Sequence, residues 1–101
     1  MRKITQDAIK ALYENKNFKR DNTIVRGHLS PITDVHSRIM YLHGNPIAKL
    51  KEGKLYISHA GWPTNTTKER LNGLPNVHIH QKDFQWYLNG EAWNGYWTLI
   101  D

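Results

Sequence analysis

Four short turn signals divide the chain into β-prone runs, and they constrain its fold more than any other feature. Gly44-Asn45-Pro46 and Glu52-Gly53 separate runs in the middle of the chain, while Asn89-Gly90 and Asn94-Gly95 separate runs near its end. Asn-Gly between two apolar runs is the strongest short signal for a β-hairpin. Strands joined by such tight turns pair antiparallel, so the sequence predicts an antiparallel sheet.

The runs between these turns are rich in β-branched and aromatic residues, which strands favour. The Gly27–Asp34 segment instead holds Gly, Ser and Pro, so we expect it to form a loop. The expected strands are Thr23–Val25, Arg38–His43, Ile47–Leu50, Leu55–His59, Val77–His80, Phe84–Leu88, Glu91–Trp93 and Tyr96–Ile100.

Two segments have the pattern of helices. Ile4–Asn17 carries an apolar stripe at helical spacing, with Thr5 in the place of an N-cap. Thr66–Asn72 is shorter and better delimited: Thr66 and Glu69 match a capping box, and Gly73 fits the position just after a helix.

Residues 1–101 are therefore expected to form one α+β domain. Its small antiparallel sheet can curl into a half-barrel, with an N-terminal helix and one short inserted helix. A chain of 101 residues with 39% hydrophobic residues has a modest core, to which aromatic side chains contribute much of the area. The expected core comprises Ile9, Leu12, Ile39, Leu55, Ile57, Trp86, Leu88, Trp93, Trp97 and Leu99.

The chain is basic, with a net charge of +5, which favours anionic partners such as nucleic acid, nucleotides or an acidic protein face. Because the basic residues are scattered, a charge that only aids solubility is an equal alternative. The absence of Cys excludes disulfides, thiolate metal sites and a Cys nucleophile. No run has the length of a signal-peptide core or a membrane span, so we expect a cytoplasmic protein, in the host cell if it is viral.

The segment from Ser58 to Lys82 brings several ligand-binding features together. A helix N-terminus attracts anions, and an aromatic residue in a loop can stack on a base. The residues that we expect to contact a ligand are Trp62, Thr66, Thr67, Lys68, Arg70, His80 and Lys82. The alternatives are ordinary helix capping by the threonines and a core position for Trp62.

His78 and His80 share one face of an expected strand, so both imidazoles could contact one ion or ligand. Zinc needs three or four ligands, and His36, His43 and His59 have no diagnostic spacing relative to this pair. The sequence therefore assigns no metal, no cofactor and no catalytic residue. A metal-independent nuclease or phosphodiesterase that uses His78 or His80 with Lys82 is a weaker hypothesis.

Several motifs resemble a group of short, uncharacterised accessory proteins of tailed bacteriophages and prophages. These motifs are Phe18 with Asn22-Thr23-x-Val25, then LHGNPIA at 42–48, ISHAGW at 57–62, TTKERLN at 66–72, IHQKDFQWYLNG at 79–90, and Trp93 with Gly95-Tyr96-Trp97. The loop 27–35 and His78 are not part of the pattern. The resemblance implies a viral origin and a host-takeover or anti-defence role, and it implies no particular chemistry.

The sequence and the resemblance together predict a non-enzymatic phage binding protein that recognises an anionic ligand, either nucleic acid or a nucleotide immune signal. An inhibitor that docks on a host defence protein complex is the second hypothesis, since exposed aromatics and Arg are common interface anchors. Exposed sheet edges also allow a homo-oligomer.

Overall fold

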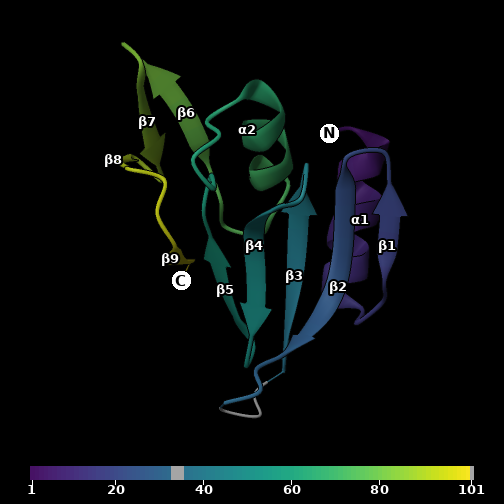
Figure 1. Ribbon diagram of the computed structural model, residues 1–101. Coiled ribbons are helices and arrows are strands. Elements are labelled where there is room, and N and C mark those ends of the chain that lie inside the picture. Colours follow the sequence, from purple (N-terminus) through teal and green to yellow (C-terminus); the bar gives the residue numbers. More distant parts are fainter. Residues whose placement is uncertain (33–35, 101) are drawn as a thin grey trace.

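A six-stranded antiparallel sheet is the centre of the fold (Figure 1). The computed structural model describes residues 1–32 and 36–100. In spatial order the sheet comprises β1 (Phe18–Arg20), β2 (Thr23–Leu29), β3 (His36–Leu42), β4 (Asn45–Lys51), β5 (Lys54–Ile57) and β9 (Thr98–Ile100). A second, three-stranded sheet comprises β6 (Ile79–Lys82), β7 (Gln85–Leu88) and β8 (Glu91–Ala92).

The two helices are α1 (Lys3–Tyr13) and α2 (Asn65–Asn72). The expected α+β class is confirmed. The described strands form two open sheets and no closed barrel, with β1 and β9 at the edges of the larger sheet. No helix in residues 1–32 or 36–100 has both the length and the apolar character that a membrane crossing needs.

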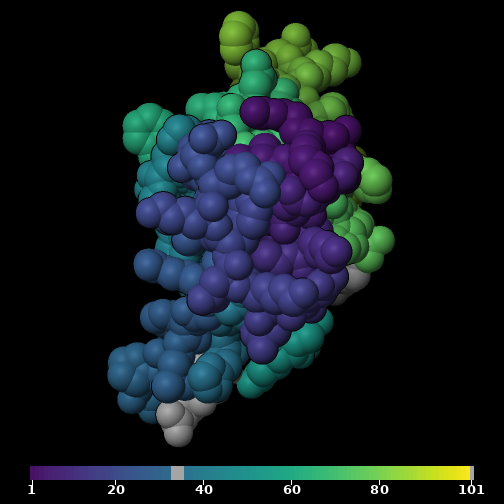
Figure 2. Space-filling view, turned by 90° about the vertical axis from the view of Figure 1, so that its right-hand side faces the viewer, coloured from purple at the N-terminus to yellow at the C-terminus, as the bar shows by residue number. Residues whose placement is uncertain are grey.

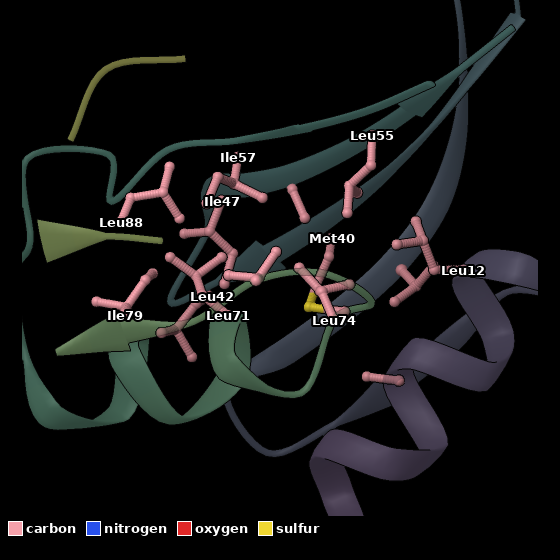
Figure 3. Close-up of a cluster of buried hydrophobic side chains, with 14 of the residues drawn as sticks. Leu12, Met40, Leu42, Ile47, Leu55, Ile57, Leu71, Leu74, Ile79 and Leu88 are labelled. Atoms are coloured by element: carbon pink, nitrogen blue, oxygen red, sulfur yellow. The ribbon is translucent and has the colours of Figure 1, made fainter. Parts of the chain in front are cut away.

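The core lies between one face of the large sheet and a layer formed by α1, α2 and the second sheet (Figure 3). Leu12 of α1, Met40 of β3 and Leu71 of α2 are each fully buried there. Trp86 and Leu88 extend the cluster onto the second sheet. The helices and the second sheet are therefore attached to the large sheet through a single hydrophobic cluster.

Most of the predicted core is confirmed, but three of its members face the other side of the large sheet. Trp97 and Leu99 are each 44% exposed, and Ile39 is half-buried. In β9, Thr98 and Ile100 pair with Ile57 and Leu55 of β5, which face the core. Side chains alternate along a strand, so Trp97 and Leu99 must face away. By the same alternation, Met40 faces the core in place of Ile39.

The two helices begin at other residues than predicted. α1 begins at Lys3, and its N-cap Arg2 makes no side-chain capping bond, while Thr5 is buried inside the helix. In α2 the capping residue is Thr64, whose hydroxyl accepts from the Thr67 N–H at 3.2 Å. The predicted capping box of Thr66 and Glu69 is therefore wrong.

Gly73 follows α2 for a reason other than backbone freedom. Its φ of −79° is open to any residue. A Cβ at this position would lie 2.6 Å from Cδ1 of Ile9 and 2.8 Å from Cγ2 of Thr5, both on α1. The missing side chain therefore lets the end of α2 pack closely against α1.

The strand predictions were too short in the N-terminal half. β1 was not expected, and β2 extends to Leu29, into the segment predicted as a loop. Arg26 and His28 of β2 pair with Ile39 and Ser37 of β3. Such cross-strand pairing lengthens strands whose own composition is weakly β-prone. Residues 33–34 of the predicted loop lie outside the described residues.

The β6–β7 turn places a bulky aromatic residue in an unfavourable backbone conformation. Asp83 and Phe84 have φ values of 52° and 66°, and the Phe84 side chain is 97% exposed. In Figure 2 this tip protrudes at the top of the molecule. The left-handed region costs a non-glycine residue about 1 kcal/mol, and Phe84 packs against nothing that would offset it.

We therefore expect Phe84→Gly to raise the free energy of unfolding by about 0.5–1 kcal/mol. Urea denaturation of the two proteins measures the difference. Phe84→Ala is the matched control, because it removes the ring and keeps the strained Cβ; equal stability of the Gly and Ala variants would contradict the explanation.

Candidate functional site

The structure separates the residues that the sequence groups as one ligand-binding set. Three of them line a single pocket, which we call the Trp62 pocket: Trp62, Thr66 and Thr67. The other four lie elsewhere. Arg70 is buried, Lys68 contacts the second sheet, and His80 and Lys82 belong to that sheet.

The Trp62 pocket is a cavity of about 350 Å³ between the β3–β4 turn and the start of α2. Leu42 and Ile47, both buried, supply its apolar part. The other lining residues are His43, Asn45, His59, Trp62, Thr64, Thr66 and Thr67. Within the described chain no Lys, Arg, Asp or Glu lines it, so its chemistry suits a neutral group.

Hydrogen bonds fix the loop that carries Trp62. The Trp62 N–H donates to the His59 carbonyl at 2.9 Å, and the Trp62 carbonyl accepts from the Thr67 hydroxyl at 2.8 Å. The Gly61 N–H donates to Nδ1 of His59 at 2.9 Å. The Trp62 side chain itself is 61% exposed. Trp62 is therefore an exposed aromatic on a fixed backbone, and the alternative of a core position is wrong.

Arg70 is fully buried and joins three parts of the fold. Its Nε donates to the Thr23 hydroxyl of β2 at 3.2 Å, and its Nη1 donates to the Thr5 hydroxyl of α1 at 2.9 Å. The guanidinium also forms an ion pair with the neighbouring Glu69 and reaches the side-chain oxygen of Asn22. With its donors engaged inside the protein, Arg70 serves the structure and is not available to a phosphate.

The Glu69 carboxyl is held ionised by the same network. Partial burial raises its pKa, but hydrogen bonds from the Thr5 hydroxyl, the Arg2 backbone N–H and Arg70 lower it, and the net pKa lies below the ordinary value. The charged carboxylate therefore stabilises the folded state.

Lys68, His80 and Lys82 contact or belong to the second sheet. Nζ of Lys68 donates to Oε1 of Gln81 at 3.3 Å and lies 5.7 Å from the centre of the Trp86 ring. His80 stacks on Tyr87 of the neighbouring strand, with ring centres 4.9 Å apart. None of these three residues lines the Trp62 pocket.

His78 and His80 lie beside a shallow depression of the second sheet, together with Asn76, Asn89 and Gly90. Nowhere in residues 1–32 or 36–100 do three or more His, Cys, Asp or Glu side chains come close enough to hold a metal ion. His59 instead packs against two aromatic rings, with its own ring centre 5.7 Å from that of Trp86 and 5.8 Å from that of Trp93.

A second candidate site, which we call the open face, is the side of the large sheet turned away from the helices. A row of direct cross-strand partners crosses five strands of this face. Each residue of the row pairs with the next one, in the order Arg26, Ile39, Lys49, Tyr56 and Leu99. The remaining members of the open face are Lys19, Ile24, Tyr41, Lys51, Lys54 and Trp97. It thus combines cationic, aromatic and aliphatic side chains.

Cations lie directly over aromatic rings on the open face. The Arg26 guanidinium is 4.8 Å from the centre of the Tyr41 ring. Nζ of Lys49 is 5.1 Å from the centre of the Trp97 ring and 5.5 Å from that of Tyr56. Such contacts contribute only about 0.5–1 kcal/mol at exposed sites, so these cations can turn to an anion at little cost.

The charge of the open face is entirely positive. The six strands of the large sheet, all described, contain seven Lys and Arg residues and no Asp or Glu. Lys51 and Lys54 are direct cross-strand partners, an arrangement of like charges that destabilises a sheet. Among the described residues, none of the open-face cations forms an ion pair. An anionic partner would relieve this repulsion.

Sequence reasoning missed the open face because its residues come from six strands. The signal that could have found it is the set of apolar or aromatic residues that alternate with cations, such as Lys49-Leu50-Lys51 and Lys54-Leu55-Tyr56. Only the register shows that the outward residues of these runs lie side by side.

Comparisons with known proteins agree with a phage origin. No curated protein and no solved structure matches the chain significantly. A family model described as the Kyanoviridae Gp96 protein matches residues 1–98. The match covers nearly the whole chain, so this phage protein belongs to the Kyanoviridae Gp96 family.

Proposed function

We propose that this phage protein is a non-enzymatic binding protein that holds single-stranded nucleic acid on its open face. The observation that carries the proposal is the row of cations and aromatic rings across a sheet face without carboxylates. Single-strand binding combines two main kinds of contact, those of phosphates with cations and those of bases with aromatic faces. Host takeover or counter-defence is the role that we propose for this binding, in keeping with the phage family.

The aromatic side chains of the open face favour a single strand over a duplex. A duplex exposes phosphates to cations but hides the faces of its bases, so Tyr41, Tyr56 and Trp97 would gain little from it. Cations and rings lie side by side on the open face, which suits a chain in which each base is attached close to a phosphate. An acidic host protein would match the charge but would leave the aromatic rings without a specific partner.

The charge also disfavours pairing of two open faces. A symmetric dimer through this surface would bring the same cations of two copies together. Exposed like charges close to each other repel, and no carboxylate of the six strands offsets them. A homo-oligomer through the edge strands β1 or β9 would leave the open face free.

We expect the protein to bind a short labelled oligo(dT) with a steep dependence on salt. Each phosphate contact on a single strand contributes about −0.7 to the slope of log K against log salt. Contacts from Lys19, Arg26, Lys49, Lys51 and Lys54 would therefore give a slope of up to about −3.5. Fluorescence anisotropy measured over a range of salt concentrations gives the slope.

Charge reversal tests the location of this binding. Arg26→Glu with Lys49→Glu lowers the net charge from +5 to +1. It should reduce affinity at least about tenfold and flatten the slope by about 1.4. Lys10→Glu with Lys82→Glu is the matched control, since both residues are exposed and the net charge becomes the same. Equal losses in the two double variants would show that only net charge matters and would contradict the proposal.

Two further ligands separate the alternatives. Duplex DNA of the same length should bind more weakly, because its bases are not free to stack. Polyglutamate should bind weakly and without dependence on Trp97. Polyglutamate binding as tight as that of oligo(dT) would favour an acidic protein partner instead.

A further inference from the structure

We infer that the Trp62 pocket binds a neutral nucleobase, presented by a free nucleoside or by an unpaired nucleotide. The pocket lies at the α2 end of the β3–β4 hairpin, and its residues are distinct from those of the open face. The inference goes beyond the proposed function and does not require it, because a nucleoside has no phosphate for the open-face cations.

The size and polarity of the cavity define the ligand class. A volume of about 350 Å³ is near the lower end of small-molecule pockets. A nucleoside matches this size, whereas a dinucleotide would extend out of it. None of the described lining residues is a Lys, Arg, Asp or Glu, so an ionic group of a ligand would find no side chain of these four types to pair with in the pocket.

The lining residues supply the two kinds of contact that a nucleobase needs. Trp62, with its ring largely exposed, offers a face for stacking beside the apolar Leu42 and Ile47. Asn45 carries both a donor and an acceptor, and the Thr66 hydroxyl can serve as either. A planar heterocycle with donors and acceptors on its edge satisfies both sets, whereas an aliphatic ligand would leave the polar groups unpaired.

The loop that carries Trp62 is held in one conformation by its own hydrogen bonds. Ala60 and Gly61 have φ values of 56° and 79°, and a left-handed alanine costs about 1 kcal/mol. Despite this cost, the loop keeps Trp62 away from the core. The bonds of its backbone to His59 and Thr67 hold it without help from the indole. A fixed loop reduces the ordering that binding would otherwise require.

Tryptophan indole N–H signals in a ¹H–¹⁵N spectrum test this inference, since Trp62 and Trp97 report on the two sites separately. Adenosine and guanosine should shift the Trp62 signal, with a dissociation constant of about 0.1–1 mM, and should leave the Trp97 signal in place. Ribose alone should shift neither. The binding should also depend little on salt, in contrast to that of oligo(dT).

Two variants complete the experiment. Trp62→Ala should weaken nucleoside binding at least about tenfold, the range expected for one lost stacking contact. Thr66→Val, which keeps the shape of the side chain and removes the hydroxyl, should weaken it less. Trp97→Ala is the control that should bind nucleosides normally. Binding that is unaffected by Trp62→Ala, or no shift of the Trp62 signal by either nucleoside at millimolar concentration, would overturn the inference, whatever oligo(dT) does at the open face.

Discussion

Arg70→Met should lower the free energy of unfolding by about 3–5 kcal/mol, because it removes a fully buried cation and leaves its partners behind. The Thr5 and Thr23 hydroxyls would each lose the donor that Arg70 supplies, and the Glu69 carboxylate would lose its ion pair. A domain of this size is stable by only about 5–10 kcal/mol. Urea denaturation followed by circular dichroism should therefore show that the variant has lost a large part of its stability and unfolds at a much lower urea concentration.

The control for Arg70→Met is Lys10→Met, which removes an exposed cation from α1. We expect it to change the free energy of unfolding by less than about 0.5 kcal/mol. Comparable losses in the two variants would contradict the role given to the buried network.

The decrease of the free energy of unfolding at acid pH is a second measurement that tests Arg70→Met. In the folded protein the pKa of Glu69 lies below its ordinary value of about 4.5, so the stability that it contributes is present above that value and is lost as the pH falls through the lowered folded pKa. Without Arg70 the folded pKa is less depressed, and the loss of stability between neutral and acid pH should be smaller than in the parent protein. An unchanged decrease at acid pH would show that Arg70 does not act on Glu69.

Trp86→Ala should lower the free energy of unfolding by about 3–5 kcal/mol, as expected for truncation of a buried aromatic side chain. Trp86 is 5% exposed, and its ring contacts His59 and Trp93, so it joins the second sheet to the loop before α2. A cavity at this position would loosen the second sheet from the rest of the core.

Two other tryptophans are matched controls for Trp86→Ala. Trp62 is 61% exposed and Trp97 is 44% exposed, so their alanine variants should remain folded and lose much less stability. Thermal melts of the three variants provide the comparison. If Trp97→Ala or Trp62→Ala were the most damaging of the three, the assignment of the core would be wrong.

The sequence was informative wherever local chemistry decides the structure. Asn89-Gly90 predicted the turn between β7 and β8, and both residues have positive φ. The helical stripe that contains Leu12 and the burial of Trp86 and Trp93 are also confirmed. In these cases the turn residues or the spacing of apolar residues act within a few positions of each other.

The errors arise where distant segments decide the structure. Thr5 resembles an N-cap, but its hydroxyl is used by Glu69 and Arg70 of α2, more than sixty positions away. Trp97 and Leu99 were expected inside because they are large and apolar. The register of β9 against β5 turns them outward, and no local signal sets that register.

The candidate site shows the same division. A short exposed segment around Trp62 could be recognised from sequence, and the structure does bring Trp62, Thr66 and Thr67 to one pocket. The sequence did not show that Arg70 is buried while Lys68 is partly accessible. Only the packing of α2 against α1 and β2 shows this difference. The open face depends on the order of six strands and was not predictable from any single segment.

Titration of ¹⁵N-labelled protein with oligo(dT), followed through the four tryptophan indole N–H signals, tests the open face most directly. Trp97 lies beside Lys49 on this face, whereas Trp86 and Trp93 are buried on the other side of the sheet. We predict that the Trp97 signal moves first and furthest, that the signals of Trp86 and Trp93 move little, and that Arg26→Glu with Lys49→Glu abolishes the Trp97 shift. A Trp97 signal that stays in place while oligo(dT) binds would contradict the assignment of nucleic-acid binding to the open face.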